Sequence, residues 1–187
     1  MFTDSEKQLL LRVVRDSIEA AVKGIPPPRI ENCPASLTHP CGVFVTLRED
    51  KELRGCIGYV EPRKRLVEAV QEVAAKAALQ DPRFDPVSAQ ELGHLEVEIS
   101  VLSPMQRVRS LDEIQIGKHG LVIELGDYRG LMLPQVAMEY GWDLETFLTQ
   151  TAQKAGLPST KWKDPNARIY VFTAEVIGEH SSTLSHE

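Results

Sequence analysis

The segment Leu53–Pro62, with the sequence LRGCIGYVEP, places a thiol and a guanidinium between glycines. If the segment is a β-strand, alternate side chains lie on one face, so Arg54 and Cys56 are expected on the same surface with Gly58 beside them. A nearby cation favours the thiolate, which is the nucleophilic form of cysteine. Cys56 is therefore a candidate nucleophile, and Arg54 is the candidate cation next to it.

The same residues also fit a protein that binds without catalysis. Cysteine is among the most frequently buried residue types and often serves as a small apolar filler. Gly55 and Gly58 weaken a strand because they pack no side chain, unless another backbone has to approach closely at these positions. In this second interpretation the glycines admit the backbone of a partner and Cys56 only fills space. The residues alone do not separate the two.

Further polar residues could complete a site. Cysteine catalysis needs a base, and His119, in the segment GKHGL, is the candidate. Glu98 is a second candidate, because it lies with Glu96 on the polar face of the strand expected over 94–103. Asp81 and Arg83 follow a helix in the segment DPRF, where they either pair with each other and the backbone or belong to a binding surface. The candidate catalytic residues are Cys56, Arg54, His119 and Glu98, and the candidate binding residues are Arg54, Gly55, Cys56, Gly58, Asp81 and Arg83.

Several classes of site and protein are disfavoured. Cys33, His39 and Cys41 lie close together, but their spacing matches no common zinc pattern, and no nucleotide-loop motif is present, so we expect no metal and no cofactor. The net charge of −6 and the lack of interleaved basic and aromatic residues make nucleic-acid binding the weakest interpretation. No segment approaches the roughly 20 apolar residues of a membrane span. Three cysteines, an odd number, favour free thiols in the cytoplasm.

The pattern of apolar residues predicts the elements that carry these side chains. Thr3 and Glu6 form a capping box ahead of a long amphipathic helix that ends at Gly24. A second amphipathic helix is expected over 64–80. Alternating or apolar runs predict strands over 42–48, 53–60 and 94–103, a hairpin over 120–133 and a last strand over 167–179.

The order of these elements predicts an α+β fold with two lobes. Residues 1–105 and 167–187 form the larger lobe, which carries both termini, and residues 106–166 form a smaller inserted lobe. The last strand then returns to the main sheet, and a cleft is expected between the lobes.

The segments LRGCIG (53–58), DPRF (81–84), EISVLSP (98–104) and GKHGL (117–121) resemble those of the AMMECR family, and the similarity extends over almost the whole chain. The resemblance implies an antiparallel sheet flanked by helices in the larger lobe and a three-stranded antiparallel sheet in the smaller one. It implies that the LRGCIG strand faces the cleft. Our leading hypothesis is therefore that the cleft binds a large substrate or partner, a protein or a nucleic acid, and that Arg54, Cys56 and their glycines line it. The family association with Memo-like and radical-SAM proteins suggests a shared modification pathway, but it defines no activity.

Overall fold

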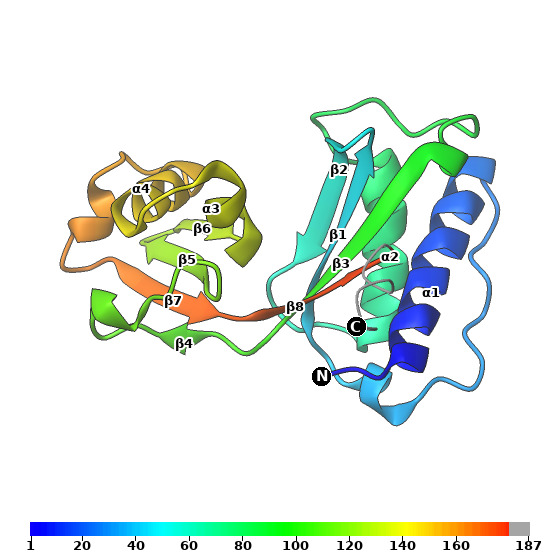
Figure 1. Ribbon diagram of the computed structural model, residues 1–187, viewed down its shortest axis with the longest axis horizontal. Helices are drawn as coiled ribbons and strands as arrows, with labels where there is room; N and C mark the ends of the chain where they lie inside the picture. The colour runs from blue at the N-terminus through cyan, green and yellow to red at the C-terminus, as the bar shows by residue number, and fades with distance from the viewer. Residues whose placement is uncertain (180–187) are drawn as a thin grey trace, which may run out of the picture. The chain divides into compact units, whose positions relative to one another are not determined.

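The computed structural model describes residues 1–179, which form an α+β fold with two four-stranded sheets (Figure 1). The described residues divide into two compact units: the first comprises Met1–Val101 together with residues 175–179, and the second comprises Leu102–Ala174. The α+β class is confirmed. None of the helices in the described part of the chain is both long enough and apolar enough to cross a membrane.

The first unit places two helices on one face of a sheet, as Figure 1 shows. Thr3 and Glu6 cap the first helix reciprocally, as predicted, and Gly24 ends it with a left-handed backbone, φ 68°. The strand order is β2-β1-β3-β8, so β2 is an edge strand. The elements of this unit are α1 (Asp4–Lys23), the 3₁₀ helix Ala35–Thr38, β1 (Gly42–Glu49), β2 (Glu52–Tyr59), α2 (Leu66–Leu79), the 3₁₀ helix Leu92–His94, β3 (Leu95–Leu102) and β8 (Ala174–Gly178).

Alternation along the strands separates two faces of this sheet. Apolar side chains such as Val45 and Ile99 are fully buried in one core with the apolar stripes of α1 and α2. The side chains between them point to the opposite face, which no helix of the described part of this unit covers (Figure 1). We call this the helix-free face of the first unit. It carries Phe44, Thr46, Cys56, Gly58, Glu96, Glu98 and Ser100.

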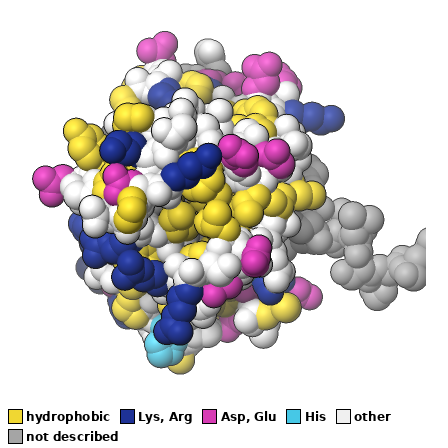
Figure 2. All heavy atoms as spheres, turned by 90° about the vertical axis from the view of Figure 1, so that its left-hand side faces the viewer, with side chains coloured by type: hydrophobic (Ala, Val, Ile, Leu, Met, Phe, Trp, Pro, Cys, Tyr) yellow, Lys and Arg dark blue, Asp and Glu magenta, His cyan; other side chains and the backbone are white. Residues whose placement is uncertain are grey.

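The second unit has its own sheet, in the order β4-β7-β5-β6, and its own core, in which Phe147 and Leu148 of α4 meet Ile123 of β5. Figure 2 looks onto this unit and shows apolar side chains exposed among charged ones; Tyr128, Met138 and Tyr140 are exposed. Its elements are β4 (Gln106–Arg107), the 3₁₀ helix Leu111–Glu113, β5 (Gly120–Leu125), β6 (Tyr128–Met132), α3 (Pro134–Tyr140), α4 (Leu144–Lys154), the 3₁₀ helix Lys161–Lys163 and β7 (Arg168–Phe172).

The last part of the chain differs from the prediction. The expected single strand over 167–179 is two strands, β7 in the second sheet and β8 in the first. Between them the Thr173 carbonyl accepts from the Ser103 amide at 2.8 Å and the Thr173 amide donates to Ser103 Oγ at 2.8 Å. The second unit therefore extends to Ala174 rather than to residue 166. The short strand β4 pairs with β7, so this sheet has four strands rather than the three implied by the family resemblance.

Candidate functional site

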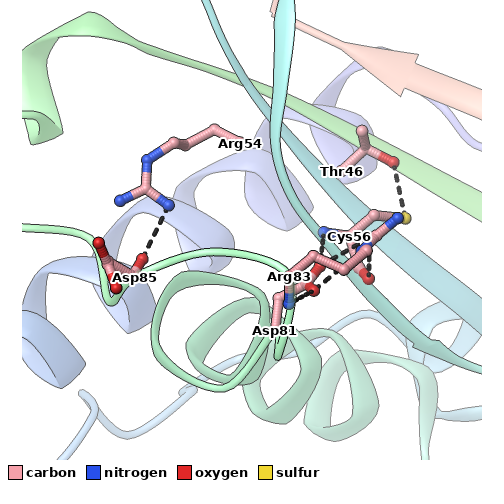
Figure 3. A network of polar contacts seen from close by, with 6 residues as sticks. All are labelled: Thr46, Arg54, Cys56, Asp81, Arg83 and Asp85. Atoms are coloured by element: carbon pink, nitrogen blue, oxygen red, sulfur yellow. Dashed lines mark hydrogen bonds and ion pairs between the residues drawn. The ribbon is translucent and has the colours of Figure 1, made fainter.

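The backbone of Cys56 lies at the exposed edge of β2 and is capped by the segment that follows α2 (Figure 3). The Cys56 amide donates to Asp81 Oδ2 at 2.9 Å, and the Cys56 carbonyl accepts from Arg83 Nη2 at 3.5 Å. An unpaired strand edge offers donors and acceptors to other chains. Asp81 and Arg83 therefore form hydrogen bonds with the backbone amide and carbonyl of Cys56, which a neighbouring strand would otherwise bind.

Asp81 and Arg83 also bind each other. The Asp81 carboxylate, with 4% of the residue exposed, accepts from Arg83 Nε at 3.0 Å and from Arg83 Nη2 at 2.7 Å. The hydrogen bonds from the Arg83 side chain, with those from the amides of Cys56 and Arg83, lower the pKa of Asp81 to about 2. These contacts match the interpretation in which the two side chains satisfy the backbone and one another. Their participation in binding stays a prediction.

The Cys56 thiol is half-buried on the helix-free face. Thr46 lies opposite Cys56 in the β1–β2 register, and Thr46 Oγ1 is 3.4 Å from Cys56 Sγ. The Cys56 amide points away from β1, so this is a pair without mutual backbone bonds, in which side chains approach most closely. The hydrogen bonds to Asp81 raise the pKa of Arg83. Because Arg83 Nη2 donates to the Cys56 carbonyl, Arg83 is the guanidinium beside Cys56 (Figure 3).

The Arg54 side chain does not lie beside the Cys56 thiol as predicted; it binds Glu91 and Asp85. Its Nε and Nη2 atoms donate to the Glu91 carboxylate at 2.8 and 3.3 Å, and Nη1 donates to the Asp85 carbonyl at 2.9 Å. Figure 3 shows the Arg54 guanidinium pointing away from Cys56 toward Asp85. The hydrogen bonds from Arg54 lower the pKa of Glu91 to about 2. Arg54 therefore holds the loop after α2, and Arg83 is the cation beside Cys56.

A β-bulge explains this change. The register pairs Arg48 with Leu53 but Leu47 with Gly55, which leaves Arg54 as an extra residue in β2. Strict alternation fails there, and the apolar side chain of Leu53 is 37% exposed. Prediction from a uniform strand assigned Arg54 and Cys56 the same surroundings because it had no signal for the bulge.

The two glycines are explained by close contacts inside the first unit. A Cβ atom at Gly55 would lie 2.3 Å from the Ala77 carbonyl oxygen of α2. A Cβ atom at Gly58 would lie 2.4 Å from Phe44 Cγ and 2.4 Å from the Val43 carbonyl oxygen. The bare backbone admits α2 on one face and the Phe44 ring on the other. The glycines therefore give no support to the approach of a partner's backbone.

Glu98 and His119, the other two predicted catalytic residues, lie in different units. Glu98 shares the sheet and the helix-free face with Cys56. His119 belongs to the second unit, where its Nδ1 accepts from the Gln115 amide at 3.1 Å and burial lowers the pKa of the imidazole. Thr46 and Glu91, which contact Cys56 and Arg54, were not predicted from the sequence. Thr46 had a signal, an outward-facing position in β1, but its pairing with Cys56 depends on the bulge.

The remaining cysteines lie in the connection before β1. Burial raises the pKa of the thiols of both Cys33 and Cys41. Across residues 1–179, no three His, Cys, Asp or Glu side chains are grouped so that they could hold a metal ion.

Comparison with known proteins gives the family. The AMMECR1 family model matches residues 11–177, nearly the whole chain. The chain belongs to the AMMECR1 family. Among its AMMECR1 relatives, a protein of Thermococcus gammatolerans is 45% identical, with 94% of this chain and 91% of the relative covered, and Protein TK0174 of Thermococcus kodakarensis is 46% identical with the same coverage. The crystal structure of uncharacterized protein PH0010 from Pyrococcus horikoshii, 41% identical, superposes with a TM-score of 0.90 over 94% of this chain and 92% of that one.

Proposed function

We propose that this AMMECR1-family protein is a binding protein that receives a partner protein on the helix-free face of the first unit, around Cys56. The observation that carries the proposal is the state of the LRGCIG segment. Arg54, Gly55 and Gly58 are engaged in contacts within the first unit, whereas the Cys56 thiol remains half-buried and available from the helix-free face. Function at this segment therefore concentrates on the thiol and its surroundings.

The surroundings of the thiol favour a protein as the partner. Phe44 and Thr46 lie on the same face, and the Arg83 side chain at its edge is 55% exposed. Aromatic and arginine side chains are enriched at the centres of protein interfaces. Glu96 and Glu98 on this face oppose a phosphate backbone. A modification pathway shared with Memo-like and radical-SAM proteins is the setting we propose for this partner, and it rests on the family resemblance alone.

Site-specific photocrosslinking tests the binding proposal. Replacing Phe44 with p-benzoylphenylalanine puts a crosslinker on the helix-free face while keeping an aromatic ring next to Gly58. Irradiation in an extract of the source cells is expected to give a discrete protein adduct, and alkylating Cys56 with N-ethylmaleimide beforehand should abolish it. The control places the same residue at Ile25, which is exposed beyond the C-terminal end of α1 in the same unit. Identical adducts from both positions, or an adduct that nuclease removes, would contradict the proposal.

A second candidate function is cysteine-dependent catalysis, which the position of the Arg83 guanidinium at the Cys56 carbonyl favours. In this version Cys56 is the nucleophile, and Glu98 or His119 transfers protons. Alkylation by iodoacetamide separates the two functions, because an activated nucleophile reacts faster in the folded protein than in the urea-unfolded chain. The binding proposal expects no such acceleration at Cys56, and expects a Cys56→Ser variant to keep the crosslinked partner.

A further inference from the structure

Four arginines gather on the second unit although they are far apart in the sequence. The face of its sheet that packs on the helices carries Ile123, Val171 and Ile169, so the residues between them point to the opposite face. We call that opposite face the arginine face. The register places Arg168 of β7 opposite Glu124 of β5, and Glu124 opposite Arg129 of β6.

The edge strand adds two more arginines to the same face. Arg107 of β4 is opposite Tyr170 of β7, and the bond from the Val108 amide to the Ile169 carbonyl at 2.8 Å continues that register. Val108 packs against the core of the unit, so Arg107, which pairs with Tyr170, points to the arginine face, and Arg109 follows just beyond the end of β4. Figure 2, which looks onto the second unit, shows Lys and Arg side chains gathered along one margin of the surface.

The charges on this face are only partly neutralised. Arg129 and Arg168 both pair with Glu124, at 3.1 and 3.5 Å. Within residues 1–179, no ion pair to a carboxylate is recorded for the side chain of Arg107 or Arg109, although Glu113 borders them and accepts from the Arg109 amide at 3.2 Å. All four arginines are exposed. Four guanidinium groups beside two glutamates, Glu124 and Glu113, leave this end of the face basic in a chain whose net charge is −6.

We propose that the arginine face binds single-stranded nucleic acid. Guanidinium groups match the geometry of phosphate oxygens and also stack on bases, and every cation on this face is an arginine. Tyr170, half-buried among them, offers an aromatic surface on which a base can stack. Val122, Leu131 and Phe172 on the same face are buried, so the proposed site is confined to the part of the face at the exposed arginines and Tyr170. This site lies in the second unit and does not depend on the Cys56 face.

Fluorescence anisotropy with the full chain tests the proposal, using labelled oligouridine and oligodeoxythymidine of about 12 nucleotides at about 50 mM salt. Binding is expected, and the two oligonucleotides show whether RNA or DNA is preferred. Counterion release predicts that Arg107→Gln and Arg109→Gln each weaken binding roughly eightfold at this salt and reduce the slope of log K against log salt by about 0.7. Tyr170→Leu should cost at least about fivefold, the loss of one stacked base.

The matched control removes the same charge from the helix side of the same unit. Lys161→Gln and Lys163→Gln should leave affinity and salt slope unchanged, because these residues lie in the 3₁₀ helix beside α4. Circular dichroism of each variant confirms that it is folded. Absence of binding to both oligonucleotides, equal losses in the lysine controls, or preference for duplex over single strands would overturn the proposal. Equal displacement by polyglutamate would also overturn it, since an acidic polypeptide would then be the ligand.

Discussion

A side chain at position 58 would collide with the Phe44 ring and with the backbone of Val43. We therefore expect Gly58→Ala to destabilise the protein by about 1 to 3 kcal/mol, the usual cost of overpacking, as measured by urea denaturation. Gly93→Ala is the matched control, because no atom lies within 4 Å of the added Cβ. The control should change stability by less than about 1 kcal/mol in either direction. Equal losses in the two variants would contradict the packing explanation.

The contacts of individual side chains were the feature that the sequence predicted least well. Cys56 and the adjacent guanidinium were found from residue types, but the guanidinium belongs to Arg83 rather than Arg54. The bulge at Arg54 breaks the alternation that would have placed Arg54 beside Cys56, and Arg83 takes that place through its bonds to Asp81 and the Cys56 carbonyl. Bulges insert one residue without a clear sequence signature, so a pattern of period two cannot reveal them.

The edge of β2 is an element whose stability depends on pH through Asp81. The pKa of Asp81 is about 2 in the folded protein, against about 3.9 in an unfolded chain. Its contribution of about 2 kcal/mol is therefore complete above pH 5 and is lost as the pH falls from about 4 toward 2. Asp81→Asn should be less stable than the wild type at pH 7, and the gap should close at pH about 2.

Urea midpoints measured across this pH range check the prediction. Amide hydrogen exchange at Cys56 gives an independent readout, since the Asp81 carboxylate accepts from that amide. Asp127→Asn, in the exposed turn between β5 and β6, is the control and should leave the midpoint unchanged at every pH. A gap between Asp81→Asn and wild type that stays constant from pH 7 to pH 2 would show that the carboxylate charge is not the cause.

At the scale of the whole molecule, each unit has its own core. The ends of the second unit meet, because Ser103 and Thr173 exchange two hydrogen bonds. We therefore expect a fragment of residues 102–174 to fold on its own and to unfold cooperatively, as followed by circular dichroism. A fragment of residues 106–166, which lacks β7 between β4 and β5, is the control and should not fold. A fragment of residues 102–174 without a cooperative transition would show that its core needs the first unit.

Elements that depend on interactions between near neighbours in the chain could be predicted from the residues alone. The capping box at Thr3, the amphipathic stripe of α2 and the alternation of the strands each arise from neighbours a few residues apart, so they could be read from the chain. The α+β class and the AMMECR resemblance followed from their order and motifs. Cys56, Asp81 and Arg83 were also found as candidates, because their residue types are unusual in a strand and a turn.

Which strands pair with one another, and in which register, is visible only in the folded structure. The alternation of apolar and polar side chains in a strand is the same whichever sheet the strand joins. The sequence therefore did not show that residues 167–179 form two strands, β7 and β8, in different sheets. Without the bulge, Cys56 would pair with Val45 rather than Thr46, and a shift of one residue changes every cross-strand neighbour. The four arginines of the second unit come from three distant segments and meet only through strand register. Pairing between strands is a long-range interaction, and local patterns do not encode it.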